Sequence, residues 1–277
     1  MAVLRARHHF AVMRDAVRLL FTHRELTWEM TKREITDRYA GQVLGTLWAI
    51  GHPLVLMGVY VFIFAFVFKM RLGGSAAMPR DYTVYLLSGL VPWLAIQESM
   101  SKSAVVMIGN ANLVKQVVFP IEILPVKGIL ASMITQAIAT VILMAYTLIS
   151  HHSLPWTYSL VPILWFFQFV AVAGLCYFLA SVSAYFRDMK DFVQVFCIVG
   201  MYAMPIFYLP GWVPDLLRPA LYANPFSYLV WCYQDVFYYG RIEHPWAWPV
   251  FIFGAVLTFY MGYRVFRKLK THIGSVL

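Results

Sequence analysis

The chain has 277 residues, of which 61% are hydrophobic and only 13% are charged. Soluble domains carry about 25% charged residues, so the composition excludes an ordinary soluble enzyme, a disordered protein and a secreted disulfide scaffold. The net charge of +9 would suit a nucleic-acid binder, but in so apolar a chain its placement matters more than its size. The sequence predicts an all-α integral membrane protein.

The first 46 residues form the most charged part of the chain, and they precede the first long apolar run. We interpret residues 1–46 as cytoplasmic amphipathic helices that lie at the membrane interface. Within them, residues 24–38 mix both signs of charge, which fits either a solvated juxtamembrane helix or a docking surface.

Six apolar runs predict transmembrane helices, since about 20 apolar residues cross a hydrocarbon layer of roughly 30 Å. They lie in a membrane domain of residues 47–266, which precedes a cytoplasmic tail of residues 267–277. The predicted spans cover residues 47–68, 82–108, 128–150, 160–186, 192–209 and 246–263.

The segment 212–239, between spans five and six, predicts a re-entrant helical hairpin. Its uncharged stretch is too short to span the membrane comfortably, and Asn224-Pro225 interrupts it. Proline removes a backbone donor from a helix interior, so two half-helices that enter the membrane and return are expected. Irregular backbone at this depth needs cover from protein or from a water-filled cavity.

The distribution of Lys and Arg predicts the orientation. Most of them precede span one, follow span six, or fall in the loops after spans two and four. The positive-inside rule then places both termini in the cytoplasm. Positive charge on that side can bind anionic lipid headgroups or a partner protein, so nucleic acid is not expected as a partner.

Sequence motifs for catalysis are absent. No GxxxxGK[ST] phosphate-binding loop occurs, so the chain is not expected to hydrolyse ATP by that route. No HExxH motif of zinc proteases and no GxSxG motif of serine hydrolases occurs, and the three cysteines predict neither disulfides nor a metal site. Glu98 and Lys102 lie one helical turn apart in span two, where a structural ion pair is favoured over a proton relay.

Aromatic residues gather in the outer half of span one and in span five. Such rings stack on sugar rings and line greasy pores, but they also serve as ordinary packing or lipid-facing residues. Both interpretations remain open. The candidates for a translocation path are Tyr60, Phe62, Phe64, Tyr202 and Phe207.

Four passages occur in a characteristic order: 33–53 (REITDRYAGQVLGTLWAIGHP), 110–126 (NANLVKQVVFPIEILPV), 185–191 (YFRDMKD) and 224–230 (NPFSYLV). Together they resemble the membrane subunits of bacterial polysaccharide-exporting ABC transporters, which are type-2 ABC permeases. These subunits export O-antigen, capsular polysaccharide or teichoic acid. The resemblance covers nearly the whole chain.

The resemblance implies a half-transporter of the bacterial inner membrane that pairs with itself as a homodimer. Two copies of a separate ATPase subunit would hold the ATP and magnesium, so this chain itself would bind no cofactor and no metal. The expected cargo is a lipid-linked polysaccharide, above all O-antigen on undecaprenyl pyrophosphate. The homodimer would form a continuous channel across the membrane.

The resemblance also implies two sets of site residues. The loop after span two resembles the family's coupling helix, and the residues expected to contact the ATPase or to fix span four are Asn112, Lys115, Phe119, Pro120, Glu122, Arg187 and Asp188. The interfacial helix is expected to flank the access route of the lipid head through Glu29, Arg33, Arg38 and Tyr39.

Other functions stay open at this stage. An exporter of teichoic acid, capsule, lipid or drug would belong to the same superfamily. A membrane glycosyltransferase or polyprenyl-phosphate transferase would need a metal held by acidic residues at the membrane surface, and the acids there are mostly interleaved with bases.

Overall fold

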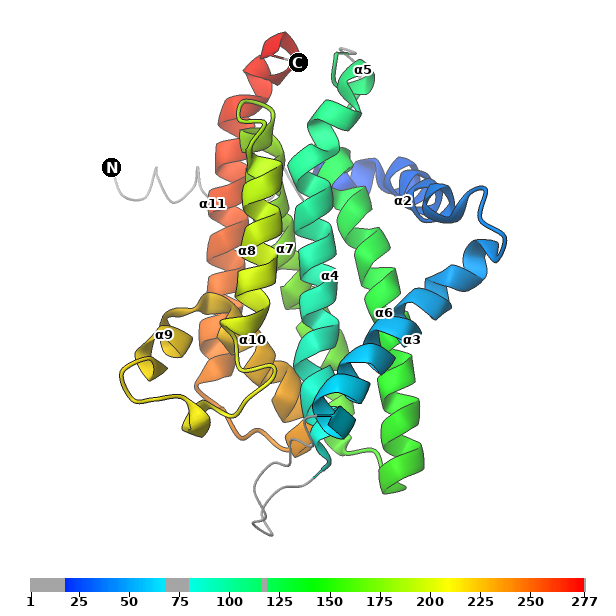
Figure 1. Ribbon diagram of the computed structural model, residues 1–277. Coiled ribbons are helices and arrows are strands. Elements are labelled where there is room, and N and C mark those ends of the chain that lie inside the picture. Colours follow the sequence, from blue (N-terminus) through cyan, green and yellow to red (C-terminus); the bar gives the residue numbers. More distant parts are fainter. Residues whose placement is uncertain (1–17, 68–79, 116–118, 277) are drawn as a thin grey trace.

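The computed structural model describes residues 18–67, 80–115 and 119–276, and the described chain is all-helical, with no β-strand (Figure 1). The long helices are α3 (Trp48–Val61), α4 (Tyr82–Gly109), α6 (Ile123–His151), α7 (Val161–Ser183), α8 (Met189–Tyr202) and α11 (Ala247–Val276). Shorter helical elements are α2 (Arg24–Tyr39), η1 (Gly45–Leu47), η2 (Phe62–Val67), α5 (Ala111–Val114), η3 (Trp156–Leu160), η4 (Pro210–Trp212), α9 (Arg218–Ala223), α10 (Pro225–Gln234) and η5 (Asp235–Tyr239).

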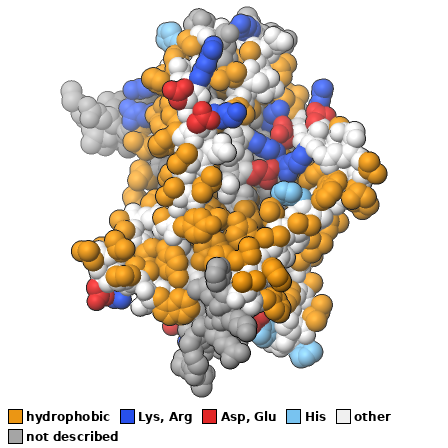
Figure 2. Space-filling model, viewed as in Figure 1, with side chains coloured by type: hydrophobic (Ala, Val, Ile, Leu, Met, Phe, Trp, Pro, Cys, Tyr) orange, Lys and Arg blue, Asp and Glu red, His pale blue; other side chains and the backbone are white. Residues whose placement is uncertain are grey.

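The chain is an integral membrane protein. Within the described residues, three helical stretches are long and apolar enough to cross a bilayer: Ile123–His151, Trp156–Ser183 and Ala247–Gly274. A shorter apolar helix covers Trp48–Phe64. On the face in Figure 2, charged side chains gather toward the end where α5 and the C-terminus lie, and hydrophobic side chains dominate the middle. We call these two ends of the bundle the α5 end and the α9 end.

α4 is the central helix of the bundle and contacts α6, α7, α8 and α10. All its side chains from Tyr82 to Trp93 are buried. A helix that is apolar on every side is stable only where other elements cover all of its faces. α4 therefore fixes the positions of the helices around it.

α7 and α11 lie side by side over most of their length and approach most closely at two glycines. A Cβ atom on Gly262 would stand 1.9 Å from the carbonyl oxygen of Gly174. A Cβ atom on Gly174 would stand 2.4 Å from the backbone of Thr258 and Phe259. Only glycine permits this backbone contact.

α8 ends at Tyr202, before the predicted limit of span five at residue 209, and Pro205 follows in a non-helical segment. Side chains from neighbouring helices satisfy the carbonyl groups of this segment. The Tyr85 hydroxyl donates to Pro205 O (3.1 Å) and Tyr208 O (2.9 Å), and Gln234 Nε2 donates to Pro205 O (2.7 Å). Buried backbone carbonyls need such partners, which explains how the chain leaves the helix here.

The segment predicted as a re-entrant hairpin contains the short helix α9 and the longer helix α10, separated at Asn224-Pro225. The Asn224 side chain accepts a hydrogen bond from the backbone of Phe226 at 3.0 Å, and Pro225 occupies the first turn of α10. Asparagine caps and first-turn prolines both favour a helix start. η5 then continues α10 to Tyr239.

The two ends of the chain differ in how far the structure describes them. Residues 1–17 of the predicted interfacial region lie outside the described residues, and α2 is the main helix of its described part. α11 continues to Val276, so the segment predicted as a tail from residue 267 is the last part of this helix. α2 packs on α6, whereas α3 crosses α6 obliquely (Figure 1).

Candidate functional site

An ion cluster joins α2 to α4 and α6. Lys102 Nζ lies 3.2 Å from Glu34 Oε1 and 3.1 Å from Glu98 Oε1, and Lys127 Nζ lies 3.2 Å from Glu34 Oε2. Arg38 forms an ion pair with Glu98. All five side chains are only partly exposed, so solvent screens these charges less than it screens surface pairs. The cluster therefore fixes the polar face of α2 onto the bundle.

The charges of this cluster set the protonation of Glu34. Burial alone would raise the pKa of Glu34, but the neighbouring ammonium groups of Lys102 and Lys127 outweigh it and hold the pKa below its ordinary value of 4.5. An opposite charge within about 4–6 Å favours the ionised form of a carboxyl group. Glu34 is therefore ionised at neutral pH and can hold both lysines.

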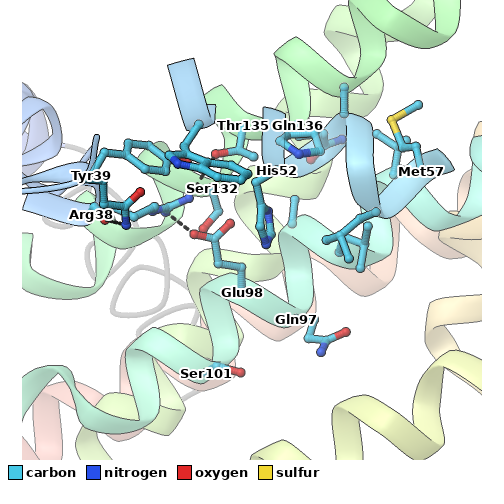
Figure 3. A pocket seen from close by; sticks show the side chains of 18 of the residues that line it. Arg38, Tyr39, His52, Met57, Gln97, Glu98, Ser101, Ser132, Thr135 and Gln136 are labelled. Atoms are coloured by element: carbon cyan, nitrogen blue, oxygen red, sulfur yellow. Dashed lines mark hydrogen bonds and ion pairs between the residues drawn. The ribbon is translucent and has the colours of Figure 1, made fainter. Parts of the chain in front are cut away.

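A cavity of about 1100 Å³ lies next to this cluster and is lined by the end of α2, the α2–α3 connection, α3, α4 and α6 (Figure 3). Arg38 and Glu98 point toward each other at its polar side, and Arg38 also donates to Thr135 Oγ1 at 3.3 Å. The Arg38 guanidinium lies 5.8 Å from the ring centroid of Tyr39, a cation–π distance. The remaining lining is mainly apolar: Val43, Leu44, Trp48, Pro53, Leu56, Met57, Val91, Leu94, Ala95 and Ala139.

The structure separates the four residues predicted on the interfacial helix. Arg38 and Tyr39 line the cavity. Glu29 instead pairs with Lys32 at 2.6 Å, and Arg33 lies 3.4 Å from Asp37, both on exposed parts of α2. Exposed pairs of this kind contribute little to stability. Arg38 and Tyr39 are therefore the two members of this set that a ligand in the cavity would meet.

The residues predicted for coupling lie at the α5 end, in two different environments. Asn112 and Lys115 are exposed on or directly after α5, while Phe119 and Pro120 are partly buried. Glu122, directly before α6, is 4% exposed, and its Oε1 atom lies 2.5 Å from Lys270 Nζ on α11. Exposed residues can meet a partner, whereas Glu122 is held within the chain.

Arg187 and Asp188 lie exposed in the turn that joins α7 to α8. The backbone carbonyl of Asp188 accepts hydrogen bonds from the amides of Asp191 and Phe192, each at 3.1 Å, and its side chain makes no capping hydrogen bond. The backbone thus starts α8, and both charged side chains face outward at the α5 end.

Four of the five predicted path aromatics come together around Phe207. The Phe207 ring centroid lies 4.6 Å from Phe64, 5.3 Å from Tyr202 and 6.0 Å from Tyr60. The Tyr60 hydroxyl also contacts Met201 Sδ at 3.5 Å. Phe62 points elsewhere and is 62% exposed. We call Tyr60, Phe64, Tyr202 and Phe207 the aromatic cluster; it joins α3 and η2 to the end of α8.

Comparison with known proteins identifies the family. Residues 25–238 match the ABC-2 type transporter family, a span that contains the ion cluster, the cavity and the aromatic cluster. The chain belongs to this family. ABC-2 type permeases are membrane subunits of transporters and lack an ATPase site of their own.

Two relatives of this permease are similar over nearly their whole length. An O-antigen export system permease protein RfbA of Klebsiella pneumoniae is 26% identical over 252 residues, covering 90% of this chain and 93% of the relative. The protein of the same name from Myxococcus xanthus is 26% identical over 242 residues, covering 87% of this chain and 90% of the relative.

Several polar contacts of the permease were not anticipated from its sequence. Glu34 and Lys270 stand in charged stretches that look solvated, and Lys127 stands alone in an apolar run, so their partners are visible only in three dimensions. Gln136 and Gln168 exchange hydrogen bonds at 2.8 and 3.0 Å, and both also bond to the hydroxyl of Tyr233, linking α6, α7 and α10. Amide side chains within apolar runs were the available signal, because buried polar groups require partners.

Proposed function

We propose that this permease is the membrane subunit of an ATP-driven exporter of lipid-linked polysaccharide, with O-antigen on undecaprenyl pyrophosphate as the foremost cargo. Two copies form the channel, and two copies of a separate ATPase subunit supply the energy. The observation that carries the proposal is the similarity, across about nine-tenths of the chain, to permeases named for O-antigen export.

The proposed orientation places the α5 end in the cytoplasm, in agreement with the positive-inside rule. Three cations illustrate the asymmetry: the exposed Lys115 and Arg187 lie at the α5 end, and the partly buried Arg218 lies on α9 at the opposite end. In this orientation the loop around α5 and the turn between α7 and α8 meet the ATPase. The exposed residues Asn112, Lys115, Arg187 and Asp188 make this contact, whereas Phe119, Pro120 and Glu122 hold the loop in shape.

The cavity beside the ion cluster suits the access route of an amphipathic anionic lipid. Arg38 offers a guanidinium to the diphosphate head, and the apolar lining of α3 and α4 accommodates a hydrocarbon chain. Glu98 balances Arg38 when the cavity is empty of ligand, so an arriving anion competes with Glu98 for the same guanidinium. Glu29 and Arg33 lie on the exposed part of α2 and attract anionic headgroups from the surrounding membrane.

The decisive experiment deletes the permease gene in its own host and follows the polymer. Under the proposal, surface polysaccharide disappears while its lipid-linked form accumulates on the cytoplasmic side. Complementation with Arg38→Gln restores less than about a tenth of the surface polymer, since a lost charge-assisted contact costs about 1.5–3 kcal/mol. Arg24→Gln is the matched control and restores it nearly fully, because Arg24 lies exposed at the start of α2, outside the cavity.

Two outcomes would contradict the proposal. Unchanged surface polymer in the deletion strain would exclude polysaccharide export, and altered resistance to lipids or drugs in that strain would assign a different cargo. A tagged permease purified in mild detergent without any phosphate-loop ATPase would exclude the ABC mechanism.

A further inference from the structure

The last turns of α11 reach the loop that the proposed function assigns to ATPase coupling. Ile273 is fully buried, and Val114 of α5 belongs to the same apolar cluster. A Cβ atom on Gly274 would stand 3.9 Å from the carbonyl oxygen of Val114, which is ordinary van der Waals contact. Residues 160 positions apart in the sequence therefore form one packed unit at the α5 end.

An ion pair between Glu122 and Lys270 joins the two parts of this packed unit on its polar side. Glu122 Oε1 lies 2.5 Å from Lys270 Nζ, and the Glu122 side chain is 5% exposed while that of Lys270 is 40% exposed. Among the described residues, Glu122 Oε2 has no hydrogen-bond partner. A buried carboxylate left without its counter-charge is strongly destabilising. The position of Glu122 therefore depends on Lys270.

Hydrogen bonds from α7 and from the α7–α8 turn hold the backbone on both sides of this ion pair. The Tyr185 hydroxyl of the α7–α8 turn donates to Leu269 O at 3.2 Å, and the Tyr177 hydroxyl of α7 donates to Glu122 O at 3.2 Å. Tyr177 itself packs against the rings of Tyr263 and Phe266 on α11. The Gly174–Gly262 contact fixes α11 against α7 farther down. A displacement of the loop thus passes to α7 and α11 together.

We infer that Lys270 is a positioning residue for energy coupling. Through Glu122 it holds residues 119–122, directly before α6, against the end of α11. The inference rests on the proposed function, because the loop needs an ATPase to act upon. This role extends the coupling region to the C-terminal end of α11, which neither the sequence motifs nor the comparisons assign to coupling.

The test uses the complete complex of the permease with its co-purified ATPase subunit. Lys270→Met removes the counter-charge, and we expect the kcat for ATP hydrolysis to fall about threefold to tenfold, within the range by which altered coupling networks change such rates. The KM for ATP and the amount of ATPase bound should stay unchanged, because Lys270 touches neither the nucleotide nor the exposed loop surface. Lys268→Met is the matched control on the same helix turn, where the lysine is exposed, and should hydrolyse ATP as the parent does.

A charge swap separates positioning from stability. The double variant Glu122→Lys with Lys270→Glu should recover kcat toward the parent value, whereas Glu122→Lys alone should lose it. The inference is overturned if Lys270→Met keeps the parent kcat, or if the swap restores the yield of complex but not its turnover. ATP hydrolysis is measured without cargo, so a failure of the polysaccharide assignment would leave this result interpretable.

Discussion

Two glycines set the distance between α7 and α11, the most extensively packed pair of described helices. Because Gly262 and Gly174 have no Cβ atoms, the α7 and α11 backbones touch, which brings Tyr177 into contact with three aromatic rings of α11. Dispersion forces grow steeply as surfaces approach, so this contact stabilises the pair where lipid offers no hydrophobic driving force. A single added methyl group would separate the helices.

Gly262→Ala is therefore expected to destabilise the permease by about 1–3 kcal/mol, the usual cost of overpacking a filled interior. Gly254→Ala on the same helix is the control, since a Cβ atom there meets nothing within 4 Å. The control should be neutral or slightly stabilising, because alanine favours a helix over glycine by up to about 1 kcal/mol. Thermal unfolding of the two purified variants in detergent measures the difference, and equal unfolding temperatures would refute the close-contact interpretation.

At the scale of elements, polar contacts decide where each helix ends and where it is attached. The carbonyl groups after α8 are satisfied by Tyr85 and Gln234, so this segment can leave the helix within the bundle. α2 is attached differently, by the ion cluster around Glu34 and Glu98. The hydrogen bonds to the carbonyl groups after α8 join uncharged groups, whereas the attachment of α2 depends on charge.

The attachment of α2 should therefore weaken in acid. The pKa of Glu34 is lower in the folded chain than its ordinary value of 4.5, so ionised Glu34 stabilises the attachment above that value. This contribution is lost as the pH falls through the lowered pKa of the folded state. A spin label on Thr36→Cys, exposed on α2, should become mobile only below pH 4.5.

Two variants check the cause of this transition. Glu34→Gln should leave the label mobile at neutral pH, because Lys102 and Lys127 lose their shared carboxylate. Asp37→Asn removes an exposed carboxylate from the same helix and should keep the parent pH profile. A label equally mobile in the parent and in Glu34→Gln at neutral pH would show that the cluster does not hold α2.

At the scale of the whole molecule, α3 and α8 are among the helices that leave apolar surfaces uncovered. On α3 these are Leu54, Val55 and Val59, and on α8 they are Phe192, Val195, Ile198 and Val199. The aromatic cluster joins these same two helices toward the α9 end. In the proposed homodimer, these surfaces meet the second copy and the channel between the copies.

Tyr202→Ala is expected to reduce export of long polymer chains about tenfold, because its ring is 54% exposed and stacks on the buried Phe207 ring at 5.3 Å, and aromatic stacking contributes roughly 0.5–1.5 kcal/mol per pair. Phe62→Ala, which removes an exposed ring outside the cluster, should leave export near the parent level. The chain-length distribution of surface polymer measures both variants. Equal loss in the two would assign the rings to packing or lipid contact.

The sequence by itself determined the helical membrane class and the family, because long apolar runs and ordered motifs along the chain do not depend on tertiary contacts. It also indicated the interruption at Asn224-Pro225, since proline and an asparagine cap act on their own backbone. It suggested one pair of the ion cluster, Glu98 with Lys102, because these residues lie one helical turn apart.

Only the tertiary structure decided the rest of the site. Glu34 with Lys127 and Glu122 with Lys270 come from different helices, and their charge alone does not distinguish them from solvated residues. The same holds for the division between Arg38 in the cavity wall and Arg33 outside it. Periodicity predicts which residues share a helix face, whereas the packing of helices around α4 determines what each face meets.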